Sequence, residues 1–216
     1  MILPLSSAGD AERAAPTVQD HLGGRGILAY PTETVYGLGS AADAESLDRL
    51  AALKGRPAGK PFLLLVSGRA MAERAGLVFS PAAHALAEAF WPGPLTLVLR
   101  GGEGKLPDAL RGPEGGIAVR HTSHKAVARL IGLLDQPLTS TSANRPGGPP
   151  APGAEQIVAM FRSAYDAGEL LVLDGGALGN VPPSTIVDCT SADPVLIREG
   201  ALPRAELRRG VGRRAP

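Results

Sequence analysis

Three cations lie close together in segment 54–61, where Lys54, Arg56 and Lys60 fall within seven residues and no acid separates them. A forked guanidinium and two ammonium groups suit a polyvalent anion such as a polyphosphate. The alternative is structural, because basic side chains are common at the end of a helix, where they balance its dipole. The segment alone leaves both interpretations open.

Polar side chains also recur at the ends of apolar runs, in segments 32–36, 139–144 and 184–188. Side chains at strand ends meet at one edge of a sheet, where α/β proteins bind their ligands. Each segment could instead be a turn that satisfies its own backbone. Their recurrence favours one shared cleft, and its candidate residues are Thr32, Thr34, Tyr36, Arg120, Ser142, Asn144, Ser184 and Arg198.

Several other chemistries are excluded by what the chain lacks. Cys189 is its only cysteine, so an internal disulfide and a multi-cysteine zinc site are ruled out. The residues around Lys60 do not form a P-loop, and no dinucleotide fingerprint, hydrolase elbow or zinc-protease motif occurs. His121 and His124 have no cysteine and carboxylate set beside them, so we interpret them as ordinary surface histidines. We therefore expect no metal held by side chains.

The composition is that of a globular protein. The 216 residues are 44% hydrophobic and 20% charged, with a formal net charge of +1. Such a balance gives no global reason to expect a nucleic-acid partner, and the length suits one large domain. No apolar run reaches the roughly 20 residues that span a bilayer, and the first twenty residues lack a secretory pattern. We expect a cytoplasmic protein with no membrane partner.

The elements that must position these residues can be read from caps, breakers and apolar periodicity. Helices are expected over 11–22 with an interruption near Pro16, from Asp43 to Lys54, from Ser80 to Phe90, from Ser123 to Leu134, and over 154–167. Strands are expected at 26–30, 62–66, 95–99, 117–120, 170–173, 185–188 and 195–198. This order predicts an α/β (α+β) single domain with a mixed sheet flanked by helices. The arginine-rich end is expected to be a frayed, solvated tail.

Six motifs in a fixed order resemble the YrdC-like domain of the Sua5/YciO/YrdC family. They are Pro31 to Gly39, Lys54 to Pro61, Trp91 to Thr96, Ser142 to Asn144, Ser184 to Asp188 and Arg198 to Gly200. The match extends over roughly residues 20–202. The resemblance implies a YrdC-like domain over 1–202, with a strongly twisted mixed parallel and antiparallel sheet around a basic cavity, followed by a basic tail over 203–216.

The resemblance also implies an activity, that of an L-threonylcarbamoyladenylate synthase. Such enzymes combine L-threonine, bicarbonate or CO2, and ATP with Mg²⁺, and release pyrophosphate. Their product passes to downstream threonylcarbamoyl transferase proteins, which modify adenosine 37 of tRNA (t6A37). The resemblance also implies a contact with tRNA itself as an open alternative.

Roles for individual residues follow from the same resemblance. Lys54 and Arg56 would act as electrostatic catalysts, with no protein nucleophile. The residues expected to bind L-threonine are Thr32, Thr34, Tyr36, Arg120 and Ser184. Those expected to bind ATP are Lys54, Arg56, Lys60, Ser142, Asn144 and Arg198.

Some residues depart from the family pattern, and two other functions stay open. Arg145-Pro146 replaces the usual Ser-Gly, Thr122 stands where proline is common, and the C-terminal domain of the longer Sua5 type is not expected after Arg198. One rival function is an RNA-binding module that uses the same basic cavity, although 4% aromatic residues offer few stacking platforms. The other is a YciO-like paralogue with different chemistry.

Overall fold

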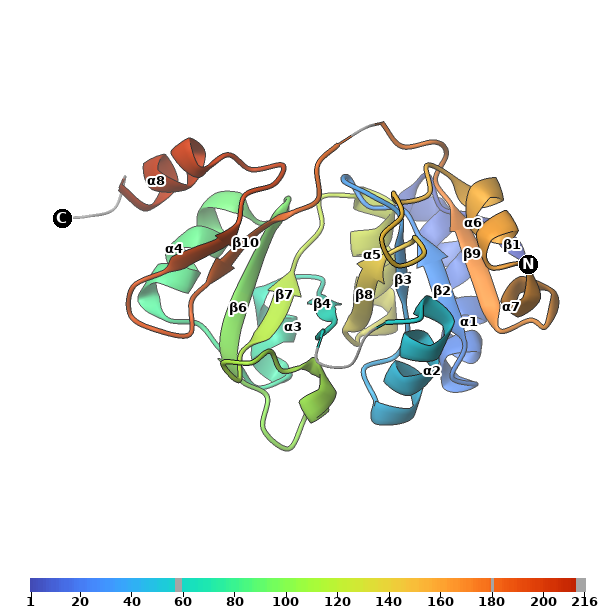
Figure 1. The fold of residues 1–216 in the computed structure, drawn as a ribbon, viewed down its shortest axis with the longest axis horizontal. Helices are drawn as coiled ribbons and strands as arrows, with labels where there is room; N and C mark the ends of the chain where they lie inside the picture. Colours follow the sequence, from blue (N-terminus) through green and yellow to red (C-terminus); the bar gives the residue numbers. More distant parts are fainter. Residues whose placement is uncertain (57–59, 180, 213–216) are drawn as a thin grey trace.

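A mixed β-sheet runs through the whole molecule (Figure 1). The computed structural model describes residues 1–56, 60–179 and 181–212, and within them the sheet has eleven strands in the order β1-β9-β2-β3-β8-β4-β7-β6-β10-β11, with β5 paired to β6. The strands are β1 (Ile2–Pro4), β2 (Ile27–Tyr30), β3 (Gly37–Gly39), β4 (Leu63–Leu65), β5 (Leu77–Val78), β6 (Leu95–Gly101), β7 (Ile117–Arg120), β8 (Leu138–Ser142), β9 (Leu170–Asp174), β10 (Thr185–Asp188) and β11 (Val195–Arg198).

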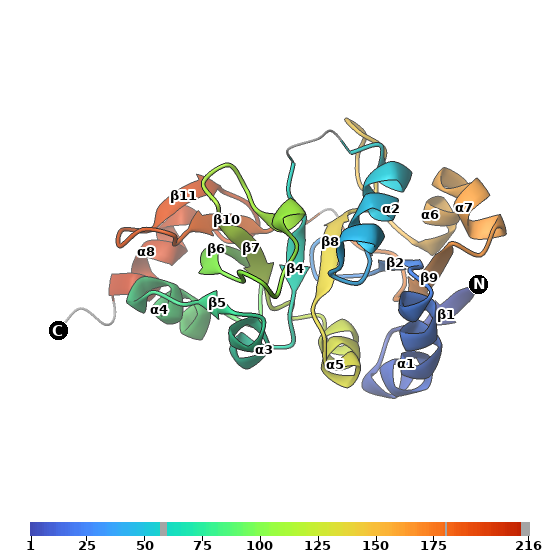
Figure 2. The same cartoon turned by 90° about the horizontal axis from the view of Figure 1, so that it is seen from below.

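Helices cover the two faces of this sheet unequally. They are α1 (Ala8–Gly23), α2 (Ala44–Lys54), α3 (Arg69–Arg74), α4 (Pro81–Phe90), α5 (Lys125–Leu134), α6 (Ala154–Met160), α7 (Arg162–Asp166) and α8 (Arg204–Gly212), with a short 3-10 helix at Asp108–Leu110. Figure 2 shows α4, α3, α5 and α1 in a row below the sheet, and α2, α6 and α7 above the half that holds β9, β2 and β8. No described helix has the length and apolar character that crossing a membrane requires.

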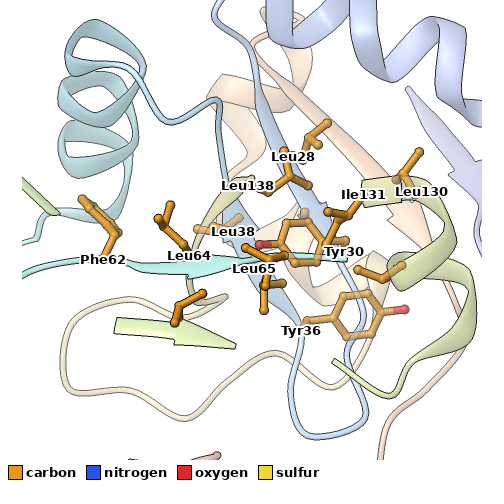
Figure 3. Close-up of a cluster of buried hydrophobic side chains, with 14 of the residues drawn as sticks. Leu28, Tyr30, Tyr36, Leu38, Phe62, Leu64, Leu65, Leu130, Ile131 and Leu138 are labelled. Carbon is orange, nitrogen blue, oxygen red and sulfur yellow. The ribbon is translucent and has the colours of Figure 1, made fainter. Parts of the chain in front are cut away.

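The pairing of the strands confirms the mixed α/β class. Strands β4 and β7 run parallel, as do β6 and β10, whereas β6 and β7 are antiparallel and so are β4 and β8. The register puts Leu64, Val119 and Leu97 side by side, and all three are fully buried. Because side chains alternate along a strand, their neighbours point to the opposite face. Figure 3 shows Leu65 close to the ring of Tyr30 in the core, whereas Leu64 lies nearer to Phe62.

Local signals set several of the predicted helix ends. The Asp43 side chain accepts a hydrogen bond from the Ser46 amide and so caps α2, which ends at Lys54 because Gly55 turns left-handed, with φ of 61°. Ser80 caps α4 in the same way. These boundaries agree with the sequence expectation, and Lys54 therefore lies on the last turn of α2.

Three helix expectations are wrong in detail. Helix α1 continues through Pro16, because a buried face that includes Val18 and Leu22 outweighs the loss of one backbone hydrogen bond. Helix α5 is capped by the His124 side chain and not by Ser123. The helix expected over 154–167 is divided into α6 and α7 at Phe161, whose ring is buried.

The C-terminal segment also differs from the frayed tail that we expected. Residues Arg204–Gly212 form α8, which packs against α4. Leu202 and Leu207 are 6% and 7% exposed, so an apolar stripe between the arginines anchors the segment. Arg213 and Arg214 lie outside the described residues, and the domain boundary at residue 202 stays a prediction.

Candidate functional site

A cavity of about 650 Å³ opens on one face of the sheet. Its floor consists of residues that alternate with the buried Leu64, Val119 and Leu97 along β4, β7 and β6. Candidate residues from five of the six motifs reach it together with neighbours that the sequence did not single out. The lining includes Thr32, Thr34, Arg56, Lys60, Thr96, Arg120, Ser140, Thr141, Ser142, Asn144, Ser184 and Arg198.

The charge of the lining favours an anionic ligand. Among the described residues that line the cavity, Arg56, Lys60, Arg120 and Arg198 are cationic, and Glu114 and Asp188 are acidic. Four positive and two negative side chains leave a surplus of two positive charges inside a concave site, where the surrounding protein strengthens their field. The cavity is therefore basic, as the sequence predicted, although the chain as a whole is nearly neutral.

Arg56 is held rigidly at one wall. Its Nη1 donates to Thr141 Oγ1 at 2.9 Å and its Nη2 to the Pro61 carbonyl at 2.6 Å. The guanidinium also stacks on the ring of Phe62, 4.5 Å from the centroid. Burial lowers the pKa of Arg56, yet an arginine keeps its charge at any physiological pH. Thr141 was not a candidate residue, and its position directly before Ser142 was the available signal.

Lys54 does not line the cavity. Its Nζ donates to the carbonyl of Ser142 at 2.5 Å, to the carbonyl of Asn144 at 2.6 Å and to the Asn144 side-chain oxygen. The Asn144 amide in turn donates to the Gly148 carbonyl at 2.6 Å. Burial, together with the charge of Arg56, lowers the pKa of Lys54 to about 8. The ammonium group has three hydrogens, and the loop that carries Ser142 and Asn144 takes all three.

The hydroxyl-rich segment after β2 lines the cavity at the end away from Arg56. Thr34 contacts Arg120, which pairs with Leu65 at the end of β4, whereas Arg56 contacts Pro61 before that strand begins. Thr32 Oγ1 accepts hydrogen bonds from the amides of Thr34 and Val35 and donates to the Val35 carbonyl. Residues 32–35 therefore form a turn that satisfies its own polar groups. Thr34 Oγ1 lies 3.2 Å from both Nη atoms of Arg120. Tyr36 is buried, and its hydroxyl donates to the Gly176 carbonyl at 2.8 Å. The structure therefore brings Thr32 and Thr34 into the lining but leaves Tyr36 in the supporting core.

Arg120 is paired with an acid that the sequence interpretation overlooked. Its Nη2 lies 2.8 Å from Glu33 Oε1, and its Nε donates to the Gly93 carbonyl at 3.2 Å. Burial alone would raise the pKa of Glu33, but the Arg120 charge and the Thr122 hydroxyl outweigh it and hold that pKa below its ordinary value. Glu33 stands inside the first motif, so its acid charge next to the candidate hydroxyls was the available signal.

Ser184 and Arg198 lie together at the end formed by β10 and β11. Ser184 Oγ is 2.8 Å from Thr96 Oγ1, and Arg198 Nη2 donates to the Ser184 carbonyl at 2.8 Å. Burial, and secondarily the charge of Arg120, lowers the pKa of Arg198. Thr96 is fully buried in a cavity-facing position of β6, and its place at the end of the third motif, Trp91 to Thr96, could have suggested it.

The two histidines, His121 and His124, are not among the residues that line this cavity. His121 packs edge-on against the Trp91 ring, with 6.4 Å between centroids, and the His124 side chain caps α5. Burial lowers the pKa of both. Across the part of the chain that the structure describes, no group of three or more His, Cys, Asp or Glu side chains could hold a metal ion.

The fold and the cavity define a mixed α/β protein with a basic cavity on one face of its sheet. The chain belongs to the Sua5/YciO/YrdC family, whose model, described as "Telomere recombination", matches residues 21–200.

Relatives of known name support this membership. A threonylcarbamoyl-AMP synthase of Thiobacillus denitrificans is 37% identical over 85% of this chain and 95% of its own length. One of Pyrococcus abyssi is 36% identical over 86% of this chain, which spans about half (54%) of that relative's length. A crystal structure of P. abyssi Sua5 complexed with L-threonine superposes with a TM-score of 0.83 and 32% identity, over 98% of this chain and 61% of that one.

Proposed function

We propose that this protein is an L-threonylcarbamoyladenylate synthase, a nucleotidyltransferase that makes threonylcarbamoyl-AMP and pyrophosphate from L-threonine, bicarbonate or CO2, and ATP. The observation that carries the proposal is one cavity with two chemically different ends. Arg56 and Lys60 stand at one end, and Thr34, Arg120 and Ser184 stand at the other. Relatives named threonylcarbamoyl-AMP synthase, which share more than a third of their aligned residues with this chain, support the same activity.

The cationic end is proposed to bind the phosphates of ATP. Arg56 is fixed by the Thr141 hydroxyl and the Pro61 carbonyl, so little side-chain entropy is lost when a phosphate arrives. Ser142 and Asn144 line the same wall, and Lys54 is proposed to hold their loop in shape. ATP is taken to enter as its magnesium complex, since the lining offers more cations than carboxylates and suits a metal carried by the phosphates.

The hydroxyl end is proposed to bind L-threonine. Arg120 Nη1 has two hydrogens and donates one to Thr34, so the second can reach the carboxylate of the amino acid. Ser184 and Thr96 add hydroxyl groups at the same end. Bound between these groups and the phosphates, the threonine amine forms an N–C bond to CO2 and releases a proton to solvent. An oxygen of the resulting carbamate then attacks the α-phosphorus. The bond from that phosphorus to the pyrophosphate oxygen breaks.

The residues contribute alignment and charge and no nucleophile. Two anions, the carbamate and the triphosphate, repel each other in water, and the cavity holds both in fixed positions. Arg56 and Lys60 neutralise the charge that builds on the leaving pyrophosphate. The product is proposed to pass to threonylcarbamoyl transferase proteins that act on tRNA, in the cytoplasm where these substrates meet.

Substitution of Arg56 tests this proposal. We expect Arg56→Ala to lower threonine- and bicarbonate-dependent pyrophosphate release by about a hundredfold or more, because a rigid charge beside the phosphates is removed. The reaction is followed with labelled L-threonine, and the adenylate is identified by mass spectrometry. Arg162→Ala is the matched control, since Arg162 pairs with Asp166 on the surface of α7.

Two outcomes would contradict the synthase activity, and each would favour a different function. ATP turnover by the wild type that does not depend on L-threonine would point to a YciO-like paralogue with different chemistry. Tight, salt-dependent tRNA binding with no ATP turnover would instead support an RNA-binding module.

A further inference from the structure

A half-buried acid, Glu33, pairs with Arg120 and is not among the residues that line the cavity. Glu33 and Arg120 have side-chain exposures of 20% and 5%, and Glu33 Oε1 lies 2.8 Å from Arg120 Nη2. The other carboxylate oxygen accepts a hydrogen bond from the Thr122 hydroxyl, and the Ser123 amide donates to Oε1 at 3.2 Å. Both oxygens of the carboxylate therefore have partners within the protein.

Thr122 connects this acid to a helix. The residue is fully buried, and its hydroxyl, besides donating to Glu33, accepts from the His124 amide at 3.2 Å. His124 caps α5, so the contact ties Glu33 to the start of that helix. Three segments thus meet at one carboxylate, namely the turn after β2, the end of β7 and the beginning of α5.

The ion pair balances the charge of Arg120 at the end of the cavity where Thr34 and Ser184 also lie, which is called the amino-acid end below. Arg120 is 4% exposed, and a guanidinium at that depth without a counter-charge is strongly unfavourable. Such an uncompensated cation would also attract any small anion of suitable size, including phosphate. Glu33 balances the charge while Thr34 and Gly93 fix the orientation of the guanidinium.

We propose that Glu33, anchored by Thr122, is a positioning residue that orients Arg120 for an amino-acid carboxylate and keeps inorganic anions away from it. The proposal rests on the proposed function only in naming the amino acid. With its charge balanced, Arg120 selects by hydrogen-bond geometry more than by net attraction. At the other end, Arg56 donates to the Thr141 hydroxyl and to the carbonyl groups of Lys60 and Pro61 rather than to an acid, so its charge is left to bind phosphates.

Glu33→Gln is the direct test, because it keeps the shape and removes the charge. We expect the KM for L-threonine to rise by about tenfold or more, as for a lost hydrogen bond to a charged group, and the KM for ATP to change less than about twofold. Inorganic phosphate should inhibit the variant competitively against L-threonine at about a tenfold lower concentration. A residue that only stabilised the fold would alter both KM values together and would not sharpen phosphate inhibition.

Further variants keep the test decisive if Glu33→Gln folds poorly. Glu33→Asp restores the charge at a shorter reach and should recover resistance to phosphate while the KM for L-threonine stays raised. Thr122→Val removes only the anchoring hydroxyl and should raise that KM by about threefold to tenfold, and Thr122→Ser should recover most of the loss. Glu12→Gln is the matched control, since Glu12 pairs with Arg129 at 2.7 Å on the surface.

The two proposals fail in different ways. Wild-type protein without threonine-dependent ATP turnover would refute the synthase activity, yet calorimetric titration of the ligand-free proteins with inorganic phosphate would still test Glu33. There Glu33→Gln should bind phosphate at least about fivefold more tightly than the wild type and Glu12→Gln. A cooperatively melting Glu33→Gln protein whose phosphate affinity and KM for L-threonine both stay within twofold of wild type would overturn the positioning role.

Discussion

At the scale of single residues, the two neighbouring cations Lys54 and Arg56 have different surroundings. Arg56 lines the cavity, whereas the Lys54 ammonium group is enclosed by oxygens of Ser142 and Asn144. Both are cations of the same short segment, 54–61, so the sequence pattern does not distinguish them. Their surroundings suggest that Arg56 acts on a ligand directly and that Lys54 acts through the loop it holds.

A double-mutant cycle tests this difference. We expect Lys54→Met, which keeps the aliphatic stem, and Asn144→Ala each to raise the KM for ATP by about tenfold. The double variant should be hardly worse than either single variant, with a coupling of about 1–2 kcal/mol, because both changes break the same contact. Steady-state kinetics of the four proteins give the coupling.

Arg56→Ala combined with Asn144→Ala serves as the comparison. Arg56 contacts Thr141 and Pro61 and not Asn144, so these two effects should add. Additive effects of Lys54→Met and Asn144→Ala would mean that Lys54 reaches the phosphates itself.

At the scale of elements, the turn after β11 fixes the end of the cavity that holds Ser184. The Thr185 hydroxyl donates to the Leu202 carbonyl at 2.6 Å and accepts from the amides of Gly200 and Leu202. Gly200 lies so close to the preceding segment that a Cβ atom there would be 2.1 Å from the Pro183 carbonyl oxygen. The return of the chain past β10 therefore requires glycine, and it sets the position of Ser184.

Gly200→Ala should displace this turn. We expect a loss of about 1–3 kcal/mol in the free energy of unfolding, because the added methyl group forces the backbone of residues 183 and 184 to move. The KM for L-threonine should rise with it, since Ser184 moves. Urea unfolding and steady-state kinetics measure the two effects.

Gly179→Ala provides the control for that substitution. A Cβ atom at Gly179 would have no neighbour within 4 Å, so its effect on unfolding should stay within about 0.5 kcal/mol. Equal stability and kinetics for Gly200→Ala and the wild type would show that the turn adapts without moving Ser184.

At the scale of the whole molecule, the candidate site draws on both halves of the sheet. Figure 1 shows β2, β3 and β8 in one half and β6, β7 and β10 in the other, with β4 between them. Thr34 comes from the turn between β2 and β3, and Arg120 comes from the end of β7. The Glu33–Arg120 ion pair spans this division, so it contributes to the folding of the domain as well as to the site.

Acid should therefore weaken the domain through this pair. The folded-state pKa of Glu33 lies below its ordinary value of 4.5, so the stabilisation is fully present above that value. It is lost as the pH falls through the lower folded-state pKa. We expect Glu33→Gln to cost about 2–4 kcal/mol in unfolding free energy, unchanged between about pH 6 and 8 and shrinking below about pH 4.5.

Urea unfolding of the wild type and Glu33→Gln across this pH range measures the difference. Glu12→Gln is again the comparison, because its exposed pair with Arg129 should contribute little at any pH. A difference between the wild type and Glu33→Gln that stays constant down to pH 3 would show that the charge of Glu33 does not stabilise the fold.

The sequence by itself determined the features that depend on near neighbours. Asp43 and Ser80 cap α2 and α4 because a cap needs residues only three positions away. The alternation of helices and strands was enough for a mixed sheet, and the ordered motifs were enough for the family. These signals are local, or they are patterns shared by relatives.

The tertiary structure alone decided which chemistry each side chain is free to perform. The partners of Lys54 lie 88 and 90 residues away, and Thr122 is 89 residues from Glu33. The strand at Gly37–Gly39 has weak β-propensity and exists because Tyr30 and β8 pack against it. Such contacts depend on strand order and register across the whole sheet, which no short window of residues contains.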